Sequence, residues 1–293
     1  MLSSAIMIEF SGARRAGGLI VLVALTAVAA PECAADCWFA PQGEGHVTEI
    51  IDARSFRLSD GREIRLAGIE PVVGDEGNAD VGEGVKRDEK QDAKQLVSAR
   101  AKPDLAAAAL AALVAGHDVT LRGDDDSPDR YGRQSAFVFR AGSDTSVQSL
   151  LLAQGEALVA ATVSDKDCAA VLSGAEAEAR QARRGVWAAP AATKNAESPG
   201  DIMARLGRFA VVEGRILSVR QAGATTYLNF GRNWTRGFAV TIPKRVLPAF
   251  QSAGIVLKSL ENRRVRVRGW IEARGGPRIE ALRTGQVELL GEN

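Results

Sequence analysis

Two arginines and a glutamate carry the clearest chemical signal in this chain. Arg65 and Glu70 lie together in DGREIRLAGIEP, and Arg133 closes the segment DRYGR just before a strand-like run. A guanidinium can hold two phosphate oxygens at once, and a carboxylate can hold a cation or orient a water molecule. These side chains would suit a site that binds or cleaves phosphodiesters, provided that the fold brings them together.

Simpler interpretations of the same residues remain open. Each arginine taken alone could be a solvated charge at a strand edge, because most exposed arginines are merely hydrated. Glu70 could be a cation ligand, or it could form a structural ion pair with Arg65 or Arg133. Because both arginines occur at strand edges within the same segment order, we favour a phosphate-binding role over simple hydration.

The order of segments from Gly45 to Trp187 resembles the thermonuclease (staphylococcal nuclease-like) domain, a nuclease with an OB fold. The resemblance rests on HVTEIIDARSFRLSDGREIRLAGIE at residues 46–70 and on DRYGRQSAFVF at residues 129–139. It implies a barrel that acts on or holds single-stranded DNA or RNA.

The resemblance also implies roles for individual residues. Arg65, Glu70 and Arg133 correspond to catalytic positions. Asp52 and Glu70 would share a calcium ion, and Tyr131 would contact nucleic acid as the aromatic neighbour of the second arginine.

Two positions depart from this pattern. Arg54 stands where the family places a calcium-binding aspartate, and Val73 stands where a glutamate assists the attacking water. A guanidinium repels a cation, so calcium binding is expected to be weak or absent, and Arg54 could hold phosphate instead. Asp75 or Glu76 could replace the missing base only if their loop reaches the site.

The net charge of +1 conceals an asymmetry. Residues 36–200 contain 19 Lys and Arg against 27 Asp and Glu, whereas residues 201–293 contain 16 against 7. A basic second half indicates that polyanion contact lies mainly there, and it favours docking against the acidic first half.

The most basic strand-like segment is RRVRVRGW. Alternation along a strand places Arg264, Arg266, Arg268 and Trp270 on one face, so we predict that they bind nucleic acid by charge and stacking. The alternative is that the aromatic residues fill a core and the arginines pair with glutamates or with the acidic first domain.

The N-terminus reads as a signal peptide over residues 1–35. Arg14 and Arg15 precede an apolar run, residues 17–30, that is short for a membrane span. We expect export to the periplasm or beyond, with no membrane anchor after cleavage; an uncleaved anchor helix is the alternative.

Export implies an oxidising compartment, and cleavage would leave Cys37 and Cys168 as the remaining cysteines. We expect a disulfide between them, which would add about 2–4 kcal/mol by closing a long loop. Two free thiols are the alternative.

The predicted fold class is mainly β with helices (α+β). A thermonuclease-like OB-fold barrel is expected at residues 36–188, a linker at 189–203, and a basic OB-like barrel at 204–293. The Gly-rich, charged residues 71–102 read as an insertion.

Periodicity predicts three strands over residues 46–70, and further strands over 118–123 and 133–140. Helices are expected over 103–115, 146–154 and 168–183, and in the second barrel five strands with one helix, near 244–253, between the third and fourth.

These features lead to one functional hypothesis with two rivals. The chain is expected to be an exported nuclease-like protein. The rivals are a nucleic-acid binder without catalysis and a periplasmic scaffold that binds proteins or envelope polymers.

Overall fold

The computed structural model describes residues 39–72, 104–124, 127–233 and 235–291. Several expected features lie outside these ranges: the signal peptide, Cys37, Val73, Asp75, Glu76 and all but the first two residues of the 71–102 insertion.

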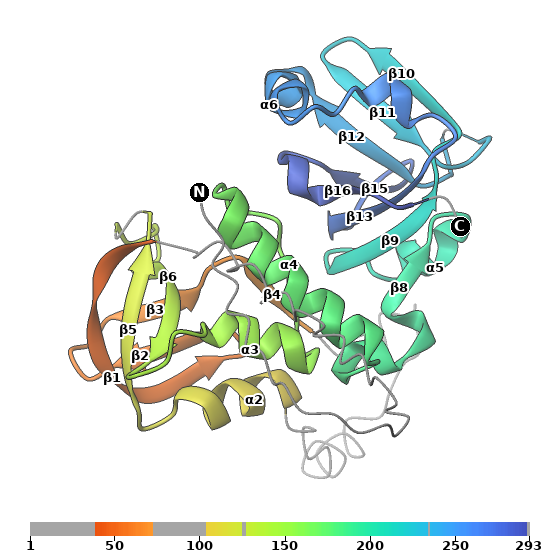
Figure 1. Ribbon diagram of the computed structural model, residues 1–293. Helices are drawn as coiled ribbons and strands as arrows, with labels where there is room; N and C mark the ends of the chain where they lie inside the picture. Colours follow the sequence, from red (N-terminus) through yellow and green to blue (C-terminus); the bar gives the residue numbers. More distant parts are fainter. Residues whose placement is uncertain (1–38, 73–103, 125–126, 234, 292–293) are drawn as a thin grey trace, which may run out of the picture. The chain divides into compact units, whose positions relative to one another are not determined.

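The first domain is built on a closed five-stranded barrel (Figure 1). Its strands follow the order β1 (Ala40–Asp52), β2 (Ser55–Leu58), β3 (Glu63–Leu66), β6 (Arg133–Arg140) and β5 (Asp118–Gly123). Only β3 and β6 pair in parallel; the other neighbours are antiparallel. Because side chains alternate along a strand, Phe56 and Ile64 point inward and are fully buried.

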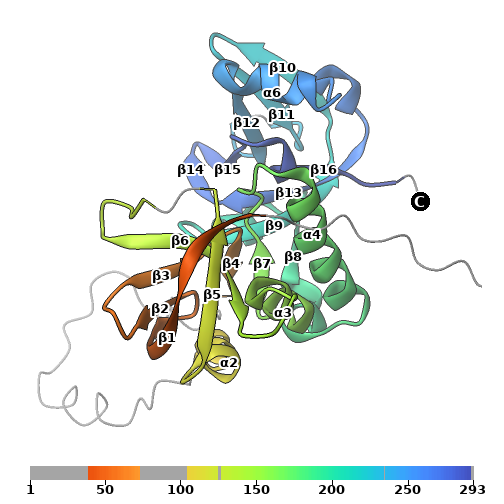
Figure 2. The ribbon, with the colours of Figure 1, turned by 60° about the vertical axis from the view of Figure 1, so that its left-hand side comes forward.

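Three helices pack against this barrel, and in both ribbon views α3 lies between α2 and α4 (Figures 1 and 2). They are α2 (Leu105–Val114), α3 (Val147–Gln154) and α4 (Lys166–Gln181). Each begins at a side chain that accepts hydrogen bonds from the first-turn N–H groups: Asp104, Ser146 and Asp165 respectively.

A small two-stranded sheet joins the barrel to the helices. It pairs β4 (Ile69–Pro71) with β7 (Ala157–Val159) in antiparallel fashion, so that Glu70 lies opposite Leu158. This pairing fixes the strand that carries the predicted catalytic glutamate.

The turn after α3 depends on a glycine. Gly155 has a φ of 76°, and a Cβ at this position would lie 2.3 Å from the carbonyl oxygen of Arg184. The close approach lets the chain after α4 enter the short 3-10 helix η2 (Gly185–Ala188), where the amide of Val186 donates to the carbonyl of Gly155 over 3.0 Å. A side chain at Gly155 is therefore excluded both by conformation and by contact.

The second domain consists of two sheets around a core of its own. The larger sheet has the order β10 (Ser218–Ala222), β11 (Thr225–Asn229), β12 (Ala239–Pro243), β15 (Gly276–Glu280) and β14 (Glu272–Arg274). The smaller sheet has the order β16 (Val287–Leu289), β13 (Arg264–Trp270), β9 (Phe209–Arg215) and β8 (Thr193–Asn195).

Two bent stretches carry the chain from one sheet to the other. Only Ile216 and Leu217 separate β9 from β10, and only Ile271 separates β13 from β14. Counted as single bent strands, they give the order β9–β10, β11, β12, α6 (Leu247–Ser252), β13–β14 and β15, which is the predicted order of five strands with one helix. Two short strands, β8 before them and β16 after them, are additional to the prediction. Both ribbon views draw α6 next to β10–β12 (Figures 1 and 2).

The segment expected to be a linker is largely structured. β8 pairs in parallel with β9, and α5 (Pro199–Met203) follows it, with Ile202 fully buried in the second core. The second domain therefore begins near Thr193 rather than at residue 204. Pro, Ala, Lys and Asn gave no strand signal here, because a three-residue edge strand has too few side chains to show alternation.

The predicted fold class is confirmed: the chain is mixed, mostly β, with an OB-fold barrel followed by a second β domain. The predicted strands at 118–123 and 133–140 coincide with β5 and β6. The cap of α4 is Asp165 and not Asp167, so the helix starts two residues earlier than expected. No helix in the described ranges is long and apolar enough to cross a membrane.

Replacing Gly155 tests the turn after α3. Gly155→Ala should lower the free energy of unfolding by about 2 kcal/mol or more, because it adds a contact with the backbone at Arg184 to the strain of a left-handed alanine. Gly116→Ala is the matched control: Gly116 also has a positive φ, but open space surrounds its Cβ position, so about 1 kcal/mol is expected. Urea denaturation measures both, and equal losses would contradict the contact.

Candidate functional site

Arg65 and Arg133 lie on the same face of the first barrel. In the parallel pair β3–β6, Arg65 is the partner of Ser135 and Glu63 is the partner of Arg133. Paired residues point to the same side of a sheet, and Ile64 between Glu63 and Arg65 points into the core. Both guanidiniums therefore belong to the outer surface, on neighbouring strands, and both are half-buried.

Arg133 is oriented by an aspartate that the sequence interpretation missed. Its Nε and Nη2 donate to the Asp129 carboxylate over 3.0 and 2.8 Å, and the same aspartate accepts from the backbone N–H of Tyr131 and Arg133. These bonds lower the pKa of Asp129 to about 2. The exposed ring of Tyr131 lies 4.9 Å from the Arg133 guanidinium carbon. The turn DRYGR thus presents a fixed cation beside an aromatic ring.

Arg65 contrasts with Arg133 because no carboxylate of the described residues forms an ion pair with it. Opposite Arg65 on β2 lies Ser55, whose buried Oγ has no hydrogen-bond partner among the described residues. A buried hydroxyl without a partner is unusual, so Ser55 is a further residue to associate with this site. Apart from its place after the β1–β2 turn, no sequence pattern pointed to Ser55.

The β1–β2 turn holds Asp52 and Arg54. The Asp52 carboxylate accepts the backbone N–H of Arg54 over 2.8 Å, and the Arg54 carbonyl accepts the N–H of Leu66 over 2.8 Å. Asp52 therefore serves as the cap of its own turn. Its charge still acts on Arg133, whose guanidinium it helps to keep protonated.

Arg54 forms an ion pair with Glu70 through its Nη1. The side chains are only 16% and 13% exposed, and burial raises the pKa of Glu70 although Arg54 acts in the opposite direction. The sequence suggested Arg65 or Arg133 as the structural partner of Glu70, and Arg54 as a phosphate ligand. The structure instead joins Arg54 to Glu70, because the turn after β1 and the strand β4 converge at that point.

This arrangement does not fit a calcium ion. Two oxygen-bearing positions, Asp52 and Glu70, remain, but the first caps a turn and the second already neutralises a guanidinium. Among the described residues no group of three or more His, Cys, Asp or Glu side chains is placed to hold a metal ion.

The arginine-rich strand of the second domain requires a correction. Arg266 and Arg268 are buried, with only 7% and 4% of their surface exposed, so they cannot present a nucleic-acid-binding face. Arg266 donates to Glu213 and Glu288, at 2.7 and 2.9 Å. Alternation correctly put these arginines on one face, but it could not reveal that carboxylates cover that face.

Arg268 binds a carboxylate of the first domain. Its Nη1 donates to both oxygens of Glu176 on α4, over 3.1 and 2.9 Å, and to the carbonyl of Val159 on β7. Glu176 also accepts the N–H of Val159 over 2.9 Å, and its side chain is 1% exposed. This buried pair is the docking between basic and acidic halves that the charge asymmetry favoured.

An apolar cluster lies beside this pair and joins the same elements. Its buried members are Leu158, Ala179, Trp187 and Val211, from β7, α4, η2 and β9. Glu288 and Arg180 extend the ionic contacts, at 3.5 Å from Arg268 and Glu176 respectively.

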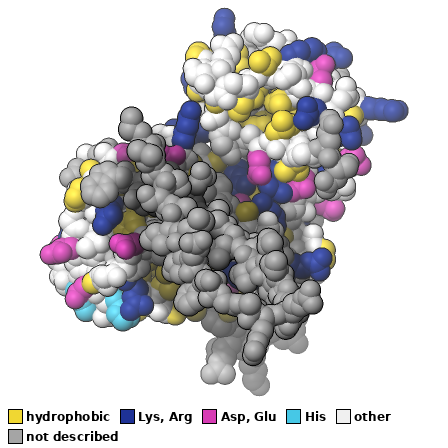
Figure 3. Space-filling model, viewed as in Figure 1, with side chains coloured by type: hydrophobic (Ala, Val, Ile, Leu, Met, Phe, Trp, Pro, Cys, Tyr) yellow, Lys and Arg dark blue, Asp and Glu magenta, His cyan; other side chains and the backbone are white. Residues whose placement is uncertain are grey.

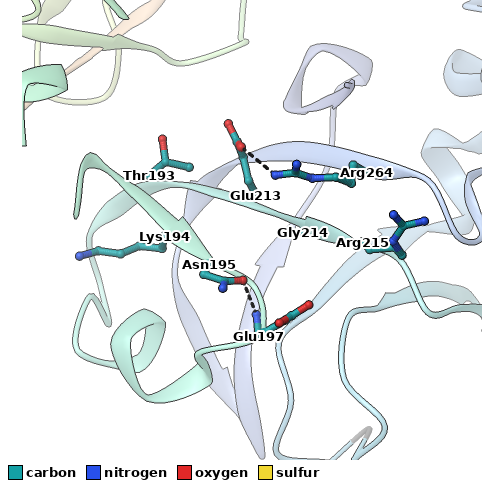
Figure 4. A pocket seen from close by; sticks show the side chains of 8 residues that line it. All are labelled: Thr193, Lys194, Asn195, Glu197, Glu213, Gly214, Arg215 and Arg264. Carbon is teal, nitrogen blue, oxygen red and sulfur yellow. Dashed lines mark hydrogen bonds and ion pairs between the residues drawn. The ribbon is translucent and has the colours of Figure 1, made fainter. Parts of the chain in front are cut away.

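The other two residues predicted on the arginine strand stay accessible. Trp270 is 49% exposed and meets Phe209 edge-on, and the side chain of Arg264 is half exposed, 3.7 Å from Glu213. Arg264 lines a shallow groove of about 480 Å³ along β8 and β9. Figure 4 shows that Lys194 and Arg215 in this groove point in opposite directions, so its cations do not converge on one ligand.

Cys168 begins the buried side of α4. It is fully buried, and its N–H donates to the capping Asp165 over 2.8 Å. Since Cys37 lies outside the described residues, the Cys37–Cys168 disulfide stays a prediction.

Residues 77–189 match the model of a family described as Staphylococcal nuclease homologue, over less than half of the chain. This segment is therefore staphylococcal nuclease-like. Asp129, Tyr131 and Arg133 lie inside the matched range, whereas residues 52–70, with their departures from the family pattern, precede it. No curated protein matches the chain.

The buried pair predicts a large stability effect. Glu176→Gln should lower the free energy of unfolding by about 3–5 kcal/mol, because it leaves the buried Arg268 charge with only the more distant and more exposed carboxylate of Glu288. Glu49→Gln is the control: it removes an equal charge from the exposed Glu49–Arg57 pair and should cost less than about 1 kcal/mol. Similar losses in guanidinium denaturation would mean that the Glu176 pair is not buried in solution.

Proposed function

Starting from its nuclease-like segment, we propose that the first domain holds single-stranded nucleic acid by its phosphodiester backbone and does so without calcium. Arg65 and Arg133 are the phosphate-binding groups, and Tyr131 contacts a base or sugar beside them. The observation that carries this proposal is the Arg54–Glu70 ion pair.

The ion pair provides, from within the chain, the positive charge beside Glu70 that a divalent cation would otherwise provide. A guanidinium that is part of the chain compensates Glu70 and cannot exchange with solvent. It also offers no open coordination position, so it cannot lower the pKa of a bound water as a catalytic metal does. These properties favour binding over metal-assisted hydrolysis.

The two remaining guanidiniums differ in how they would contribute. Arg133 is held by Asp129, which fixes its direction and leaves its other N–H groups for an anion. Arg65 has no ion-pair partner among the described residues and would bind phosphate without an aspartate to orient it. Both lie on the barrel's outer face, where a long polymer has access.

Hydrolysis is the second candidate, favoured by the family match. It would require a base that reaches a water molecule beside the phosphate, and Asp75 and Glu76 are the acids closest in sequence to the substituted position, Val73. Arg65 and Arg133 would then stabilise the charge of the transition state.

Export to the periplasm or the medium belongs to the same proposal, supported by the signal-like residues 1–35. A disulfide between Cys37 and the buried Cys168 would suit that compartment.

Binding to a fluorescent single-stranded oligonucleotide tests the site. Arg65→Ala and Arg133→Ala should each weaken binding about tenfold or more, because each removes charge-assisted hydrogen bonds. Arg57→Ala removes an equal charge from the exposed pair with Glu49 and should have little effect. Affinity should be the same with calcium and with a chelator. Calcium-dependent cutting of the strand by the parent protein would favour hydrolysis, and absence of binding at low salt would favour a protein-binding scaffold.

The role of Arg54 can be tested by stability. Arg54→Asp should place two carboxylates face to face, so calcium should raise the melting temperature of the variant by binding the folded state, and leave the parent unchanged. Arg57→Asp serves as the control and should not respond to calcium. A parent protein that calcium stabilises as strongly as the variant would contradict the ion-pair substitution.

A further inference from the structure

The second domain carries an excess of positive charge that its buried arginines do not account for. From Gly214 to Leu260 the chain contains seven Lys and Arg residues and no Asp or Glu. This acid-free run builds β10, β11, β12 and α6. Such an excess can be met by water and counterions, by a carboxylate surface or by a polyanionic ligand; within the domain, Lys258 pairs with Glu261 just beyond the run.

Strand register places part of this charge on one outer surface of the five-stranded sheet. Arg220 on β10 pairs with Tyr227 on β11, and Tyr227 pairs with Thr241 on β12. Ala239, two residues before Thr241 and so on the same side of β12, pairs with Arg278 on β15. These side chains therefore point to the same side. The opposite side forms the core, where the buried side chains are Leu228, Val240, Ile242 and Ile279. We call Arg220, Tyr227, Thr241 and Arg278 the basic–aromatic face.

An aromatic ring and a guanidinium stack on this face. The guanidinium carbon of Arg278 lies 5.5 Å from the centroid of the half-buried Tyr227 ring. No direct ion pair joins Arg220 or Arg278 to a carboxylate in the described ranges, although Arg220 is close enough to help lower the pKa of Glu261. Flat groups of this kind accept nucleic-acid bases by stacking, and unpaired cations accept the phosphates between them.

Further charged residues surround the basic–aromatic face. Arg232 and Arg236 lie on the loop between β11 and β12, and both are exposed. Three described carboxylates border the face: Glu280 lies beside Thr241, Glu272 lies beside Arg278, and Glu261 accepts the N–H of Val219 on β10 over 2.8 Å. In the view of Figure 3, Lys and Arg side chains project from the rim of the second domain. The positive charge of the face is therefore carried by Arg220 on β10, Arg278 on β15 and the two arginines of the β11–β12 loop.

We propose that this basic–aromatic face binds single-stranded nucleic acid, with the phosphodiester backbone on Arg220 and the loop arginines and a base stacked against Tyr227 and Arg278. An acidic protein would satisfy the charges but has no use for the half-buried Tyr227–Arg278 stack, so the face favours a nucleic acid. The surface is separate from the Arg65–Arg133 site and does not require that site to be active, although both would serve one ligand.

The test uses the full chain and a fluorescein-labelled oligo(dT) with oligo(rU) beside it, followed by anisotropy over a salt series. In the background Arg65→Ala/Arg133→Ala, which removes the first site, binding should persist. Adding Arg220→Ala/Arg278→Ala should weaken it at least about fivefold at low salt and reduce the slope of log K against log[salt] by about 1.4, for two lost phosphate contacts. Tyr227→Ala should weaken binding about fivefold or more, and Tyr227→Phe should not, because phenylalanine keeps the stacking ring.

The control is Arg215→Ala/Arg283→Ala, which removes two exposed charges of the same domain outside the five-stranded sheet. An equal loss in this control would show a diffuse charge effect and overturn the proposed face. Competition by poly-glutamate as strong as by unlabelled oligonucleotide would overturn the choice of ligand. If binding is lost when only Arg65 and Arg133 are replaced, the first site is supported and the basic–aromatic face is refuted. The face is also refuted if binding is retained after Arg220 and Arg278 are replaced in the otherwise unchanged chain.

Discussion

The buried contact between Glu176 and Arg268 constrains both halves of this molecule. Two charges that are almost completely withdrawn from water depend on each other, since either one alone would carry a large desolvation penalty. The same carboxylate accepts the N–H of Val159 on β7. Strand β7 pairs with β4, which carries Glu70, so one glutamate both docks the second domain and supports the strand beneath the candidate site. The site and the interface are thus parts of a single scaffold.

At the candidate site, too, a buried carboxylate is neutralised by an arginine from another element. The first domain has a half-buried carboxylate, Glu70, and meets its need for a positive partner with Arg54 from the β1–β2 turn. A side chain on a short turn reaches a defined place and remains there, whereas a metal ion exchanges and brings water with it. The barrel can therefore carry the proposed phosphate-binding arginines without a metal ion beside Glu70.

Sequence reasoning located the elements better than it located their partners. Strands β5 and β6 had sharp boundaries because turn residues flank alternating apolar runs, and the Arg65–Arg133 pairing on one face followed from the family framework. The partners of Arg268 and Arg54 could not be read in the same way. Each lies on a different element, and alternation says which way a side chain points but not what covers it.

The parallel pairing of β8 with β9 affects how the molecule can be divided. A fragment that starts at residue 204 would lack Thr193–Asn195 and leave the backbone groups along one side of β9 without hydrogen-bond partners. Such an open edge can recruit strands from other copies, so that fragment would be prone to self-association in isolation. Expression of the second half as a soluble unit therefore has to begin before β8, where the chain leaves η2, and even then the Arg268 charge would be left to solvent.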